Sequence, residues 1–100
     1  EQKTFAYEAA GQTLVIHLPR EIAHHNCKKL KIETDLLLEE NYIRRIVFDF
    51  SHTQFMDSSG IGLILGRHKL VSAMGGVVVV QKAPKDIKRM LSIAGIESKD

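Results

Sequence analysis

Length, composition and charge limit the kinds of protein that this chain can be. It has 100 residues, of which 44% are hydrophobic, as expected for one compact domain. The 14 Lys and Arg residues barely exceed the 12 Asp and Glu residues, and a net charge of +2 predicts neither nucleic acid nor a membrane surface as the main partner. Cys27 is the only cysteine, and the start of the sequence lacks the basic and apolar regions of a secretory signal. A soluble protein of the reducing cytoplasm is therefore expected.

The first half of the chain predicts a hairpin, a long helix and a central strand. Residues 4–9 suit a first strand, and Gly11 offers a turn into the apolar alternation over 14–18, which is typical of a β-hairpin. Apolar positions at helical spacing predict a helix from about 24 to 40. The nearly continuous apolar run 46–50 predicts a central strand that flanking helices bury on both faces.

The second half predicts two more helices and one more strand. A helix is expected to begin near Ser58 and to end at Gly75-Gly76, and the apolar run 77–80 follows as a strand parallel to the central one. Pro84 suits the first turn of a third helix, and Gly95 suits its C-terminal cap. Together these elements predict an α/β fold with a mixed sheet of four or more strands and helices mainly on one face.

The turn Asp57-Ser58-Ser59-Gly60 stands where the central strand leads into the second helix. In open α/β sheets, ligands and chemistry collect at this edge. The N–H groups at a helix start stabilise an anion, so a phosphate on Ser58 is tolerated there, while its charge beside Asp57 opposes the docking of a partner. The residue types alone favour the simpler interpretation that Asp57, Ser58 or Ser59 caps the helix, and they do not choose between the two serines.

Two glycines spaced four residues apart give the predicted second helix a flat stripe. Gly62 and Gly66 would allow another backbone to approach the helix closely. The side chains expected to face the sheet are Ile61, Ile64 and Leu65. The side chains expected to add apolar and polar contacts for a partner are Leu63, Arg67 and Leu70. Packing of the stripe within the chain's own fold is the alternative.

Three patterns of catalysis or ligand binding fail on inspection. Among the glycines of 60–66, the third falls one position late for a dinucleotide-binding loop. A serine hydrolase would need glycine where Met56 stands. His24 and His25 are adjacent and diverge on a helix, so they and Cys27 make a poor metal site. The sequence therefore predicts no enzymatic activity, no metal and no cofactor.

A longer run around the turn resembles a known family. The run is Phe55-Met56-Asp57-Ser58-Ser59-Gly60-Ile61-Gly62-Leu63-Ile64-Leu65-Gly66-Arg67. It is similar to the STAS domain of bacterial anti-sigma factor antagonists, most closely the sporulation type. The similarity extends over nearly the whole chain and includes the region from Glu21 to His25, the Gly75-Gly76 turn and the segment from Ala83 to Ile96.

The resemblance implies a transcription regulator that works by partner switching. In this family the first serine of the Asp-Ser-Ser-Gly turn, here Ser58, is phosphorylated by the anti-sigma factor, which is itself a serine kinase. The unphosphorylated form binds that kinase and frees the sigma factor, phosphorylation ends the antagonism, and a serine phosphatase restores the active form. ATP belongs to the kinase, and the free antagonist is expected to be a monomer.

The resemblance also implies a partner-binding surface around the phosphorylated serine. The residues expected on this surface are Glu21, His24, His25, Asp57, Ser58, Ser59, Gly60, Gly62, Leu63, Gly66 and Arg67.

The chain departs from the family at two places. Where the family commonly has Gly-Glu-Leu-Asp before the first helix, this chain has Arg20-Glu21-Ile22-Ala23, so a capping Asp is missing and Asn26 or a histidine would cap instead. The family's last strand and helix have no counterpart, so residues 1–100 are expected to form a single, shortened STAS domain. These departures leave open a STAS interaction module in another signalling or transporter-regulating assembly.

Overall fold

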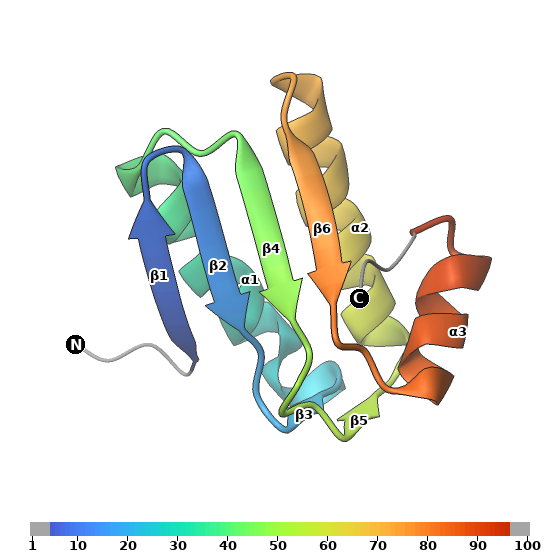
Figure 1. Ribbon diagram of the computed structural model, residues 1–100. Helices are drawn as coiled ribbons and strands as arrows, with labels where there is room; N and C mark the ends of the chain where they lie inside the picture. The colour runs from blue at the N-terminus through green and yellow to red at the C-terminus, as the bar shows by residue number, and fades with distance from the viewer. Residues whose placement is uncertain (1–4, 97–100) are drawn as a thin grey trace.

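The computed structural model describes residues 5–96, in which each of three helices follows one or more strands (Figure 1). In chain order the elements are β1 (Ala6–Ala10), β2 (Thr13–His17), β3 (Glu21–Ile22), α1 (His24–Glu40), β4 (Arg45–Asp49), β5 (Phe55–Met56), α2 (Ser58–Ala73), β6 (Val77–Gln81) and α3 (Lys85–Ile93). The predicted helix over 24–40 is confirmed at both ends. The first strand begins later than predicted, and residue 4 lies outside the described residues. Pro84 occupies the N-cap position, immediately before α3, and not the first turn of the helix as predicted.

Four strands form a mixed sheet, as predicted, and their order is β1-β2-β4-β6. The hairpin pairs β1 and β2 antiparallel, while β4 lies parallel to both β2 and β6. A separate pair of short parallel strands, β3 and β5, was not predicted. It lies beyond the carboxyl ends of β2 and β4 and leads directly into the two longest helices (Figure 1).

The core lies between the sheet and the helices. Alternation along the strands turns one set of side chains toward α1 and α2 and the other set away from them. The fully buried side chains on the helix-facing side of the sheet are Leu14, Ile16, Ile46, Phe48 and Val80. The helical side chains that are buried against them are Leu30, Leu37, Ile64, Val71, Ile87 and Leu91. Because all three helices bury side chains in this core, they lie mainly on one side of the sheet.

The prediction that helices cover β4 on both faces is wrong. The helices lie mainly on one face of the sheet (Figure 1). Val47 and Asp49 point to the other face and are nonetheless buried, because β2 and β6 flank them in register. A central position in the sheet, without a second helical layer, accounts for the continuous apolar run.

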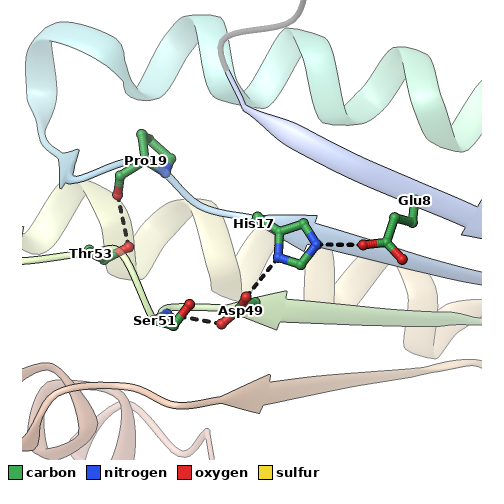
Figure 2. Close-up of polar contacts among 6 residues, drawn as sticks. All are labelled: Glu8, His17, Pro19, Asp49, Ser51 and Thr53. Carbon is green, nitrogen blue, oxygen red and sulfur yellow. Dashed lines mark hydrogen bonds and ion pairs between the residues drawn. The ribbon is translucent and has the colours of Figure 1, made fainter.

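Polar contacts on the open face join the hairpin to the central strand. Figure 2 shows His17 between two carboxylates: its Nδ1 lies 2.7 Å from Asp49 Oδ2 and its Nε2 lies 2.8 Å from Glu8 Oε2. An ionised carboxylate only accepts hydrogen bonds, so both bonds form together when both ring nitrogens are protonated and the ring is positively charged. The hydrogen bond to Glu8 and then that to Asp49 raise the pKa of His17 and outweigh the opposing effect of burial.

This bridge predicts a stability that depends on pH. Because the folded pKa of His17 is raised, its contribution to the free energy of unfolding is fully present below the unfolded pKa of 6.5 and is lost as the pH rises through the folded pKa. Thermal unfolding from about pH 6 to about pH 9 should therefore show a steeper fall in Tm for the wild type than for His17→Gln. Equal slopes for the two proteins would contradict the charged bridge.

Candidate functional site

The loops beyond the carboxyl ends of β2 and β4 hold the predicted switch turn in place. Thr53 Oγ1 donates to Pro19 O at 2.8 Å, and Ser51 N–H donates to Asp49 Oδ1 at 2.9 Å (Figure 2). Gln54 N–H donates to Arg20 O at 2.7 Å. These bonds fix the β4–β5 loop against the β2–β3 loop, so the turn after β5 starts from a rigid base.

The serine at the start of α2 is open to solvent. Ser58 is the first residue of the helix and is exposed, whereas Ser59 is half-buried and Gly60 is buried. The Ser59 hydroxyl interacts with the Asp57 carboxylate, while the Ser58 hydroxyl makes no hydrogen bond to any residue of 5–96. The structure thus separates the two serines, which the sequence did not: Ser58 is the more exposed of the two, and its hydroxyl is the one without a hydrogen bond to a described residue.

One carboxylate caps both long helices. Asp57 Oδ1 accepts from Ser59 N–H at 2.8 Å at the start of α2, and Asp57 Oδ2 accepts from His24 N–H at 3.1 Å at the start of α1. Burial alone would raise the pKa of Asp57, but the backbone hydrogen bonds from His24, Ser59 and Gly60 outweigh it and lower the pKa. The capping interpretation of the turn is therefore right for Asp57. The Ser58 hydroxyl takes no part in these cap hydrogen bonds.

Asn26 holds the backbone that precedes α1. Its Oδ1 accepts from Ala23 N–H at 2.9 Å, and its Nδ2 donates to Glu21 O at 2.8 Å. The backbone before α1 is therefore held without an acidic residue at position 23. The expectation that Asn26 or a histidine caps α1 is therefore met only in part: Asn26 binds the N–H of Ala23 from inside the helix, and the N–H of His24 is bound by Asp57.

The β3–β5 pair brings the start of α1 beside the switch turn. Glu21 pairs with Phe55 and Ile22 with Met56, so the exposed His24 and His25 lie on the same side of the molecule as Asp57. His25 Nε2 lies 3.2 Å from Glu21 Oε1. Among residues 5–96 there is no group of three metal-ligating side chains.

Glycine is required at position 60 by this pairing. A Cβ atom there would overlap the side chain of Met56 and press on Ile22. Gly60 therefore lets the first turn of α2 pack onto β5. Gly60 is buried in the free chain, and this internal packing was not predicted for it.

Phe55 is a surface residue that was not singled out from the sequence. Its side chain is 52% exposed, three residues before Ser58, while its neighbour Met56 is buried. The alternation of a strand puts these two side chains on opposite faces. The alternation of Phe55 and Met56 could have been read from the sequence, but the two-residue strand β5 was not predicted.

The glycine stripe is confirmed, but two of its predicted neighbours are not on the surface. Gly62 and Gly66 both face open space. Leu63 and Arg67 are each only 6% exposed, so little of either side chain is on the surface of the free chain. At 3.6 residues per turn, both lie near the buried Ile64 and Val71. Of the other side chains expected to face the sheet, Ile61 and Leu65 are half-buried.

Comparison with known proteins identifies the family. The profile of the STAS domain matches residues 4–99, which is nearly the whole chain. The chain belongs to the STAS domain family. A relative of this STAS domain, the "Anti-sigma F factor antagonist" of Paenibacillus polymyxa, is 34% identical over 83 residues, which cover 83% of this chain and 71% of the relative.

Solved STAS domains share the fold. The unphosphorylated form of the anti-sigma factor antagonist SpoIIAA superposes with a TM-score of 0.81 at 26% identity, covering 97% of this chain and 88% of that one. The phosphorylated form of the Bacillus cell fate determinant SpoIIAA gives a TM-score of 0.78 at 27% identity, with 92% and 84% of the two chains covered. Among residues 5–96, no helix is both long enough and apolar enough to cross a membrane.

Proposed function

We propose that this STAS domain is an anti-sigma factor antagonist that binds an anti-sigma factor and is released by phosphorylation of Ser58. The observation that carries the proposal is the exposed Ser58 hydroxyl at the start of α2, which makes no hydrogen bond to any residue of 5–96. The names of the antagonist relatives support the class of partner. That SpoIIAA exists in phosphorylated and unphosphorylated forms supports the switch.

The phosphate would be accommodated by the helix and rejected by the partner. The N–H groups and positive dipole end at the start of α2 stabilise a negative group on Ser58 without unfolding the helix. The same group brings about two negative charges next to the ionised Asp57, whose pKa is lowered by its hydrogen bonds from His24, Ser59 and Gly60 despite the opposing effect of burial. A partner that covers this surface would have to desolvate that charge, so docking is opposed.

The phosphoryl group would come from the anti-sigma factor acting as a serine kinase. Ser58 Oγ gives up its proton and forms a bond to the γ-phosphorus of ATP, and ADP leaves. A serine phosphatase would reverse the modification by transferring the group to water. ATP would be bound by the kinase, so we expect the phosphoryl transfer to take place in the cytoplasm. No catalytic residue is assigned to this chain.

The contact surface follows from the exposure of the predicted residues. Gly60 and Leu63 are buried and are left out of it, exposed Phe55 is added, and Gly66 and Arg67 lie farther along α2, where they line a groove with α1. The residues that would meet the anti-sigma factor around the switch are Glu21, His24, His25, Phe55, Asp57, Ser58, Ser59 and Gly62. The departure at positions 20–23 is compensated by Asn26 and Asp57, so it does not favour a different assembly.

Incubation with the anti-sigma factor from the same genome and ATP tests the modification. Tandem mass spectrometry should find one phosphate, on Ser58, and Ser58→Ala should remain unmodified. Ser59→Ala is the matched control because it changes the neighbouring hydroxyl, and it should still be phosphorylated on Ser58. A phosphate found on Ser59 in the wild type, or none at all, would reject Ser58 as the switch.

A further inference from the structure

A second surface lies farther along the helical layer, where α1 and α2 run side by side (Figure 1). It is a groove of about 700 Å³, called here the α1–α2 groove. The side chains and backbone that line it belong to Lys31, Asp35, Leu38, Glu39, Gly66, Arg67, Lys69, Leu70 and Met74. Gly66 follows Ser58 by two helical turns, or about 12 Å along the axis, so this groove does not include the switch turn.

Arg67 in this groove has hydrogen-bonding capacity that the described residues do not use. Its side chain is only 7% exposed, and its Nη2 lies 3.3 Å from Asp35 Oδ1. Arg67 Nε and Nη1 are buried without a hydrogen-bond partner among residues 5–96, and so is Asp35 Oδ1. Buried N–H groups of a charged side chain are costly to leave unpaired. The pair between Arg67 and Asp35 is thus an incomplete one, in which the guanidinium still lacks acceptors.

The rest of the groove indicates which acceptor fits. Lys31, Lys69 and Arg67 face two carboxylates, Asp35 and Glu39, so one positive charge is in excess. The ammonium of Lys31 is already engaged by Asp35 at 3.1 Å. A carboxylate is planar and accepts two parallel hydrogen bonds from one guanidinium, which makes it the best match for Arg67.

Apolar side chains adjoin this charge. Leu70 is 42% exposed and Met74 is 52% exposed, one and two turns beyond Gly66. A Cβ at Gly66 would touch nothing, so another chain can approach the helix backbone closely. The groove therefore suits an acidic residue with apolar neighbours on a protein segment, and it suits a small inorganic anion poorly.

We propose that the α1–α2 groove is a second docking site for the anti-sigma factor, in which a carboxylate of that protein binds the Arg67 guanidinium and apolar side chains beside it cover Leu70 and Met74. This inference rests on the proposed function. It adds the chemistry of the partner: an acidic and apolar segment separate from the part that reaches Ser58. A standard interface buries about 800 Å² on each partner, which is wide enough to include both the switch turn and this groove.

Two variants test the groove. Leu70→Asp places a negative charge on an exposed position, so it leaves the fold intact and repels an incoming carboxylate. Arg67→Leu removes the guanidinium and leaves Asp35 with its ion pair to Lys31. Removing one partner of a buried pair costs stability, so the Tm of this variant is measured beside its binding. Ile93→Asp on α3 is the matched control, because it makes the same kind of change at a side chain that is 82% exposed and does not line the groove.

Isothermal titration calorimetry of the full chain with the anti-sigma factor from the same genome gives the readout. Leu70→Asp and Arg67→Leu should each raise the Kd at least about tenfold, while Ile93→Asp should bind like the wild type. If the wild type binds and both groove variants bind equally well, the groove is not a docking site although the proposed function stands. If the wild type itself does not bind, the proposed function fails and this inference fails with it. Should Arg67→Leu not fold, Leu70→Asp decides alone.

Discussion

Ser58→Asp should weaken binding to the anti-sigma factor by about a hundredfold, with little change in Tm. The new carboxylate stands at the start of α2, where the helix dipole favours a negative charge, so the fold is not strained. It also stands beside Asp57, whose carboxylate is ionised and held by two helix starts. A partner that covers this surface would have to desolvate two adjacent like charges.

Ser58→Ala is the matched control for that result. It removes the hydroxyl without adding charge, and because Ser58 makes no hydrogen bond to any residue of 5–96, nothing is left unpaired. Its affinity should remain close to that of the wild type, and incubation with kinase and ATP should not lower it. If Ser58→Ala lost binding as completely as Ser58→Asp, the hydroxyl would be a direct contact and the charge would not be the switch.

Gly62→Gln should stabilise the fold and weaken binding at the same time. Glycine in a helix interior costs about 0.5–1 kcal/mol relative to a good helix former, so the free energy of unfolding should rise by about that amount. A Cβ at Gly62 touches nothing among residues 5–96, so no clash with them opposes the gain. The longer side chain would keep the partner's backbone away from α2, and the Kd should rise about tenfold or more.

Ser72→Gln controls for the change of helix propensity. Ser72 is exposed on α2, close to the opposite end from the switch turn. This variant should not alter the affinity for the anti-sigma factor. Chemical denaturation measures the stability of both variants, and calorimetry measures their binding. A Gly62→Gln protein that is more stable and binds as the wild type does would remove the glycine stripe from the contact surface.

Local patterns were sufficient for the main elements of the fold. The helix over 24–40 was predicted with its observed bounds because apolar spacing marks its buried face. The start of α2 at Ser58 was also foreseen, since polar capping residues follow an apolar strand there. Gly95 has a φ of 90°, the left-handed conformation that a helix C-cap favours and that glycine adopts without strain.

Features that depend on tertiary contacts were not predictable in the same way. The strands β3 and β5 have two residues each, too few for a periodic signal, and exist because the loops beyond β2 and β4 meet. The double cap by Asp57 requires the starts of α1 and α2 to converge. The bridge from Glu8 through His17 to Asp49 requires the strand register, although alternation alone puts all three side chains on one face.

Arg67 was misplaced for a different reason. Its charge suggested a surface position, but helical spacing places it near the buried Ile64 and Val71. If helical spacing had been given more weight than residue type, Arg67 would have been predicted to be buried. Its neighbour across the groove, Asp35, could not be identified without the arrangement of the two helices.

Comparison of phosphorylated and unphosphorylated chains in one binding experiment tests the central claim most directly. The protein is phosphorylated with the kinase, the single site is verified by mass spectrometry, and both forms are titrated into the anti-sigma factor by calorimetry. The account predicts tight binding of the unmodified form and no measurable binding of the form that carries phosphate on Ser58. Equal affinities of the two forms would contradict it.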